Sequence, residues 1–105
     1  MSTPLSLGTT RGDDGRVVLT AAGEIDLSNI GVFSHALGTA TAEADPAQLV
    51  VDLTAIEYLD SAAINALYGL ASHIHLIVNP ALMRSLRISG LAEIISIEPV
   101  ATEAQ

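Results

Sequence analysis

The chain has 105 residues, of which half are apolar, and a formal net charge of −8. This length corresponds to a single domain, which we expect to span 1–105 with its core at about 5–98. The charge opposes binding to nucleic acid and to anionic membranes. Cysteine and lysine are absent, which excludes disulfides, thiolate catalysis, a Walker A loop and Schiff-base chemistry. We expect no cofactor.

Hydropathy patterning predicts a cytoplasmic protein. No apolar run approaches the ~18 residues of a membrane-spanning helix, and Met1–Gly15 lacks the apolar segment of a signal peptide. The absence of cysteine fits a reducing compartment. Because the aromatic residues are only Phe33, Tyr58 and Tyr68, the core must consist mainly of Val, Ile, Leu and Ala.

The N-terminal part of the chain predicts a β-hairpin. Leu5–Thr9 is expected to form a short edge strand, and residues 11–15 (RGDDG) have the composition of a turn. Arg16–Ala22 is the second predicted strand, and Gly23 is expected to break it.

A helix is predicted over Ser28–Ala42, because apolar residues recur there at helical spacing. Asp26 and Ser28 are both able to cap this helix. The apolar positions are Ile30, Phe33, Leu37 and Ala40.

The middle of the chain predicts a strand, a helix and another strand. Leu49–Leu53 is apolar apart from Asp52, a pattern typical of a strand covered on both faces. A helix is expected over Ser61–Ala71 and a strand over Ile74–Val78. One face of the helix is expected to carry Ile64, Leu67, Tyr68 and Ala71.

The C-terminal part predicts a third helix and a last strand. Asn79-Pro80 begins the helix, since proline is favoured in a first turn, and Gly90 ends it. Ile94–Ile97 is the last predicted strand, and Val100–Gln105 is a short tail. The residues expected to face the core are Leu82, Met83, Leu86 and Leu91.

The predicted element order is β-β-α-β-α-β-α-β. Alternation of strands and helices implies parallel strands joined by right-handed crossovers. The first strand would lie antiparallel at an edge. The fold class is therefore α/β, with a mixed sheet of four to five strands and three or more helices.

The pair Asp60-Ser61 is the most informative feature of the sequence. The hydroxyl of Ser61 would lie in the first turn of a helix, at the carboxyl end of a buried strand. Unpaired backbone N–H groups and the positive end of the helix dipole meet at such a position. A phosphate on Ser61 would find hydrogen-bond donors there. The alternative is that Ser61 only caps the helix.

Other polar residues favour structural roles. Asp52 is expected to accept backbone N–H bonds, because the lysine of a receiver-type phosphoaspartate site has no candidate here. His73 and His75 would share one face of a strand, but only the distant His35 is available as a third ligand, so no metal site is expected.

An enzyme is not expected, because no histidine has a context that places it beside Asp60-Ser61 and no G-x-S-x-G motif exists. Arg84 and Arg87 are expected to form a solvated helix face, late in the third helix where cations complement the dipole.

Five short motifs occur in an order typical of one family. They are Gly23-Glu24-Ile25-Asp26 with Leu27-Ser28, Val50-Val51-Asp52-Leu53, Leu59-Asp60-Ser61, Val78-Asn79-Pro80 and Ser89-Gly90-Leu91. Over roughly Leu5 to Glu98 the chain resembles a STAS domain, and in particular the small bacterial anti-sigma factor antagonists.

This resemblance implies a regulatory role. Family members bind an anti-sigma factor that is also a serine kinase, and so release a sigma factor. Phosphorylation of a serine at the start of helix two separates the complex, and a phosphatase resets it. That serine corresponds to Ser61, and the acidic residue of the Gly-Glu-Leu-Asp motif to Asp26. The implied partner-binding residues are Asp26, Ser28, Asp60, Ser61, Ala62, Ile64 and Asn65.

Two departures from the family pattern concern the same region. The chain has Asp60-Ser61-Ala62-Ala63 where Asp-Ser-Ser-Gly is common, and the stretch from Ser61 to Val78 is shorter than usual. The alternative function is therefore a STAS interaction module of a transport or scaffold complex that is not phosphorylated.

Overall fold

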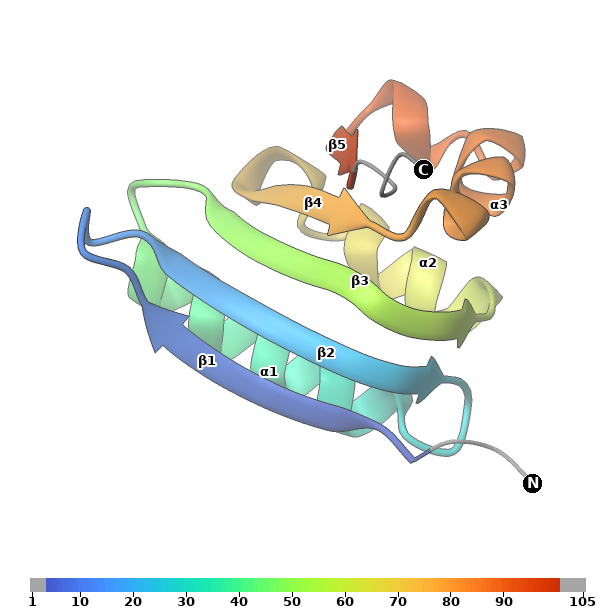
Figure 1. Ribbon diagram of the computed structural model, residues 1–105, viewed down its shortest axis with the longest axis horizontal. Coiled ribbons are helices and arrows are strands. Elements are labelled where there is room, and N and C mark those ends of the chain that lie inside the picture. Colours follow the sequence, from blue (N-terminus) through green and yellow to red (C-terminus); the bar gives the residue numbers. More distant parts are fainter. Residues whose placement is uncertain (1–3, 101–105) are drawn as a thin grey trace, which may run out of the picture.

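The structure, a computed structural model, describes residues 4–100. It contains one five-stranded sheet of strand order β1-β2-β3-β4-β5, with three α-helices (Figure 1). β1 pairs antiparallel with β2, and the remaining neighbours are parallel. This confirms the predicted α/β class, element order and antiparallel edge strand. The elements are β1 (Ser6–Arg11), β2 (Val17–Ile25), α1 (Ile30–Ala44), β3 (Leu49–Leu59), α2 (Ser61–Tyr68), β4 (Ile74–Val78), α3 (Met83–Ile88) and β5 (Ser96–Pro99).

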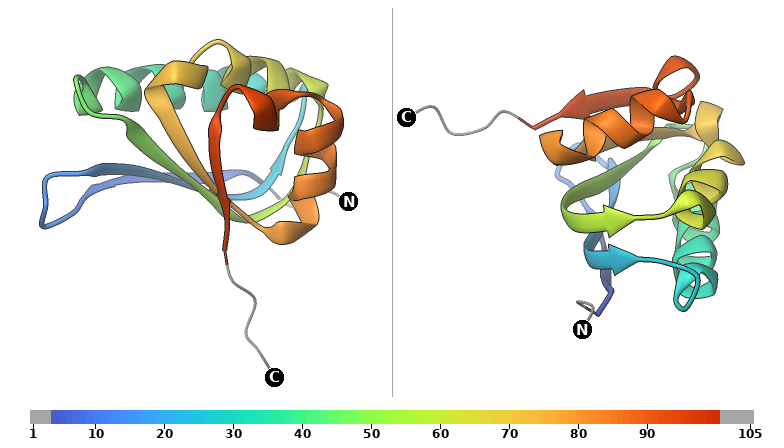
Figure 2. Two further views of the ribbon diagram at one scale, coloured as in Figure 1. Left: turned by 90° about the horizontal axis from the view of Figure 1, so that it is seen from above. Right: turned by 90° about the vertical axis from the view of Figure 1, so that its right-hand side faces the viewer.

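The helices α1 and α2 cover one face of the sheet, whereas α3 lies at its β4–β5 end (Figure 2). Side chains alternate along β2 and β4, so that one set is buried under the helices. In the part of the chain that the structure describes, no helix covers the opposite face of β2 and β3. The expectation that β3 is covered on both faces is therefore wrong. Its apolar run reflects buried residues on the helix side, and Val50, on the other face, is still only 5% exposed.

The strands β2 and β3 extend further than predicted, and their pairing contains two irregularities. The pairing shifts between Thr20 and Ala22, and again between Gly23 and Glu24. At each shift β3 has one residue more than β2, as in a β-bulge. Gly23 does not end β2: its φ of +104°, which favours glycine, carries the strand through the second shift.

The first two helices differ from their predicted bounds. α1 begins at Ile30 rather than Ser28, because residues 26–29 form a hydrogen-bonded turn. α2 ends at Tyr68, and a separate 3-10 turn follows over Ala71–His73. Gly69, a poor helix former, stands at this break. The buried residues of α2 are Ala63 and Leu67, whereas Tyr68 is exposed.

The C-terminal helical region begins at Asn79, as predicted. The Asn79 side chain accepts a hydrogen bond from the backbone N–H of Ala81. A 3-10 turn over Pro80–Leu82 leads into α3, which places Arg84 near the start of that helix rather than late in it. Gly90, with a φ of +84°, ends the helical stretch as predicted. Leu91 is fully buried and packs back as expected.

The last strand is Ser96–Pro99 rather than Ile94–Ile97. The backbone N–H groups of Ile94 and Ile95 both donate to the carbonyl oxygen of Leu91, so these residues still belong to a turn. Of the predicted tail, residues 101–105 lie outside the described part of the chain.

Candidate functional site

Ser61 is the first residue of α2 and its side chain is exposed. It follows β3 at the edge of the sheet where the parallel strands end. The end of β3 pairs with the end of β2 through Leu59 and Ile25. The backbone N–H of Asp60 also donates to the carbonyl oxygen of Ile25 at 3.3 Å. The two segments that carry Asp26 and Ser61 therefore lie beside each other, although 35 positions separate them in the sequence.

Asp60, and not Ser61, caps α2. Its Oδ1 atom accepts hydrogen bonds from the backbone N–H groups of Ala62 and Ala63 at 3.0 and 3.2 Å. These are two of the donors that a helix start leaves unpaired. We expected unpaired backbone N–H groups that could bind a phosphate on Ser61. For the N–H groups of Ala62 and Ala63 this expectation is wrong, because both already donate to Asp60. The capping alternative for Ser61 is wrong as well, because the cap is its neighbour.

A hydrogen-bonded turn links β2 to α1. Oδ1 of Asp26 accepts from the backbone N–H of Ser28 at 2.9 Å and from its hydroxyl at 2.5 Å. The Asn29 side chain accepts from the N–H of Asp26 and donates to the carbonyl oxygen of Glu24. Neither Asp26 nor Ser28 caps α1, whose N-cap residue is Asn29. Both side chains instead fix the turn.

The pKa of the Asp26 carboxyl is lowered by this turn. The main cause is the hydrogen bond from the Ser28 hydroxyl, followed by the bond from the Ser28 backbone N–H. Both stabilise the ionised form. Asp26 thus carries a firmly held negative charge at the same edge as Ser61.

The other predicted partner-binding residues differ in accessibility. Asn65 is exposed one helical turn after Ser61. Ala62 and Ile64 are half-buried, and Ile64 packs against the core. Ile64 thus lies on the apolar face of α2 as the helical pattern predicted.

Sequence reasoning missed three exposed apolar side chains in the segments around Ser61. Leu27 is 77% exposed, Val32 62% and Tyr58 50%. Leu27 lies in the turn before α1, Val32 in the first turn of α1, and Tyr58 near the end of β3. Leu27 could have been recognised as exposed from the sequence, because it is an apolar residue between the polar residues Asp26 and Ser28 in a turn.

The remaining polar candidates have structural partners. Asp52 accepts from the backbone N–H and the hydroxyl of Thr54, beside the first irregularity of β3. His75 contacts Ser96 and Glu98 on β5, whereas His73 is exposed at the end of a 3-10 turn.

Among residues 4–100 no three potential ligands are grouped so that they could hold a metal ion. Within the same range no helix is long and apolar enough to span a membrane.

The arrangement is that of a small α/β domain with an accessible serine at a helix start, next to Asp60 in the sequence and at the same end of the sheet as Asp26. Residues 9–104 match the family model of the STAS domain. The chain belongs to the STAS domain family, as the motifs predicted.

Named relatives of the chain are anti-sigma factor antagonists. It is 40% identical over 68 residues to the anti-sigma-F factor antagonist RsfB of Mycobacterium tuberculosis. This match covers 64% of the chain and spans about half the length, 55%, of that relative.

Solved structures share the fold of this chain. An anti-sigma factor antagonist from Mycobacterium paratuberculosis superposes with a TM-score of 0.82 at 26% identity, covering 92% of this chain and 87% of that one. The antagonist SpoIIAA in its unphosphorylated form shares the fold, with a TM-score of 0.68 at 17% identity and coverage of 93% and 90%.

Proposed function

We propose that this protein is an anti-sigma factor antagonist whose binding is switched off by phosphorylation of Ser61. In this proposal it binds an anti-sigma factor that is also a serine kinase, and so releases a sigma factor. A phosphatase restores the unmodified form. The whole chain acts as one domain, and its location is the cytoplasm, where ATP is available to the kinase. The observation that carries the proposal is the exposed Ser61 at the start of α2, in a chain similar to antagonists.

In this proposal the surface around Ser61 is the docking area for the protein partner. Leu27 exposes apolar area in the turn that follows β2, whose end pairs with the end of β3 just before Ser61. Apolar anchors surrounded by polar residues carry most of the binding energy in protein interfaces. The polar surroundings here are Asp26, Ser28, Asp60 and Asn65.

Charge accounts for the direction of the switch. A phosphoserine adds about −1.5 to −2 charge units. Asp60 is adjacent to Ser61 in sequence, and Asp26 lies at the same sheet edge. Since Asp60 already occupies two backbone donors of α2, these donors do not neutralise the phosphate. A concentrated negative charge must then be desolvated against the partner, and like-charge contacts in an interface cost several kcal/mol.

The first test identifies the modified residue and its effect. Incubation with the cognate anti-sigma kinase and ATP should label Ser61, as mapped by mass spectrometry. Ser61→Ala should bind the kinase persistently in the presence of ATP, whereas Ser61→Glu should bind at least a hundredfold more weakly. That factor corresponds to a loss of about 3 kcal/mol. Isothermal titration calorimetry measures both affinities.

Ser85→Ala serves as the matched control, because Ser85 is an exposed serine on α3. It should be phosphorylated and released like the parent protein. Labelling of another residue, or equal affinity of Ser61→Ala and Ser61→Glu, contradicts the proposal. Binding of a transport or scaffold protein without any labelling would support the unphosphorylated interaction module instead.

A further inference from the structure

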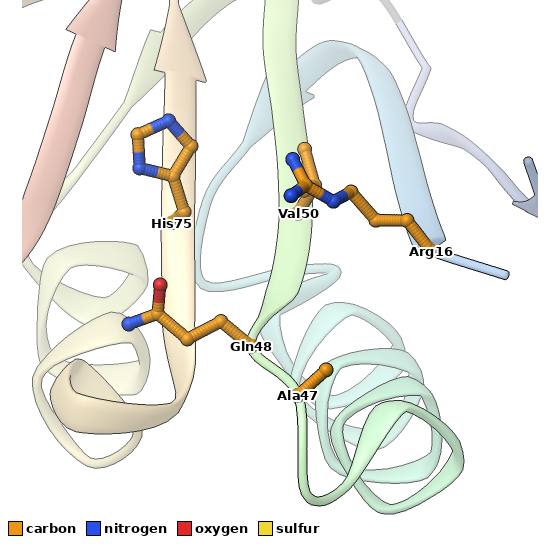
Figure 3. A pocket seen from close by; sticks show the side chains of 5 residues that line it. All are labelled: Arg16, Ala47, Gln48, Val50 and His75. Atoms are coloured by element: carbon orange, nitrogen blue, oxygen red, sulfur yellow. The ribbon is translucent and has the colours of Figure 1, made fainter. Parts of the chain in front are cut away.

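A hollow of about 310 Å³ lies where the parallel strands begin, at the end of the sheet opposite the one that carries Ser61 (Figure 3). It is formed where β2, β3 and β4 begin, on the face that α1 and α2 leave uncovered. This volume is at the lower end of the range of small-molecule sites, about 300–1,000 Å³. The side chains that line it belong to Arg16, Ala47, Gln48, Val50 and His75.

The floor of the hollow is apolar and firmly held. Val50 is only 5% exposed and pairs in register with Val18 on one side and His75 on the other. Ala47 adds a methyl group before the start of β3. An apolar floor of this kind favours a ligand with an apolar part.

Arg16 supplies an unneutralised positive charge. Its side chain extends from the start of β2 across Val50 (Figure 3). Within residues 4–100 its guanidinium has no carboxylate partner, whereas Arg11 pairs with Glu43. The nearby Asp14 carboxylate accepts from the backbone N–H of Arg16 instead. Arg84 and Arg87 also have no carboxylate partner among the described residues, so Arg16 differs from them by lining the hollow.

His75 forms a fixed wall of the hollow. Its Nδ1 atom is 2.6 Å from the Ser96 hydroxyl, and its Nε2 atom is 3.1 Å from a Glu98 carboxylate oxygen. Both ring nitrogens therefore have partners on β5, so the ring offers mainly apolar area to a ligand. The Gln48 side-chain amide adds neutral hydrogen-bond donors at the same opening.

We propose that this hollow binds a small organic monocarboxylate. The guanidinium of Arg16 holds the carboxylate through paired hydrogen bonds, the geometry that arginine favours. The Gln48 amide donates a further bond. The apolar body of the ligand lies on Val50 between Ala47 and the His75 ring. One free cation matches a single negative charge better than the double charge of a phosphate monoester.

Sodium benzoate is a suitable probe, with benzamide as its neutral isostere. Titration of the 15N-labelled protein should cause saturable shifts in the amide resonances of Arg16, Gln48, Val50 and His75. Benzamide should bind at least tenfold more weakly. Arg16→Gln should weaken benzoate binding at least tenfold while keeping the remaining spectrum. Arg84→Gln is the matched control, because Arg84 is also exposed and has no carboxylate partner among the described residues.

Three outcomes would overturn the proposal. They are the absence of saturable shifts up to the solubility limit of benzoate, equal binding by Arg16→Gln and the parent protein, and equal binding of benzamide and benzoate. Ser61→Ala should retain benzoate binding, since Ser61 lies at the opposite edge of the sheet. The two proposals therefore stand or fall separately.

Discussion

Asp60 determines how α2 begins, because its carboxylate bonds two backbone N–H groups of the first turn. Asp60→Ala removes this cap and should lower the free energy of unfolding by about 1 kcal/mol. Asp60→Asn should retain most of the stability, since asparagine caps nearly as well. Urea unfolding followed by circular dichroism measures both changes. Equal destabilisation by both substitutions would show that the charge, and not the cap, matters.

Asp26 gives a second prediction for a single residue, which concerns pH. Because its pKa is lowered in the folded protein, the folded state binds this proton less readily than the unfolded chain. The resulting stability is present above the ordinary aspartate pKa and is lost as pH falls through the lowered value. Ser28→Ala should raise the Asp26 pKa, as measured by carboxyl 13C NMR. Ser34→Ala, at an exposed serine on α1, should leave it unchanged.

At the scale of elements, the irregular strand β3 shows where sequence patterns fail. In its second half the buried residues Leu53, Ile56 and Leu59 recur every three positions. A regular strand with one buried face would bury every second residue, and a strand buried on both faces would bury consecutive residues. The two pairing shifts with β2 produce this spacing. A bulge depends on the partner strand, so the single segment could not reveal it. The regular strand β4 was predicted with correct bounds.

A contact between α2 and the end of α3 gives a prediction about element packing. The hydroxyl of Tyr68 donates to the Ser89 carbonyl oxygen at 2.8 Å. A Cβ atom at Gly90 would lie 3.2 Å from the same hydroxyl, and φ there is +84°. Gly90→Ala should therefore cost about 1–2 kcal/mol of stability. Thermal or urea unfolding measures the loss.

The control for Gly90→Ala is Gly38→Ala. Gly38 is exposed in the middle of α1, and an added Cβ would meet no atom within 4 Å. That substitution should stabilise the protein by roughly 0.5–1 kcal/mol. The cost of Gly90→Ala should also be smaller in a Tyr68→Phe background, where the hydroxyl is gone. The same cost in both backgrounds would assign the whole effect to the backbone.

At the scale of the whole molecule, the sequence predicted the order of elements and the edge that carries Ser61. Alternating strands and helices imply a parallel sheet, whereas the role of Asp26 beside Ser61 came from the resemblance to STAS domains. The hollow around Arg16 could not be predicted. It depends on three strand starts, on the uncovered face of the sheet and on side-chain directions that no local pattern contains.

The positions of the tyrosines have a practical consequence for spectroscopy. The chain has no tryptophan and two tyrosines, Tyr58 and Tyr68. Tyr58 precedes Ser61 by three residues, and Tyr68 is the last residue of the helix that Ser61 begins. The intrinsic tyrosine fluorescence of the protein therefore originates from the segments on either side of this serine. It offers a label-free signal for following complex formation and modification in real time.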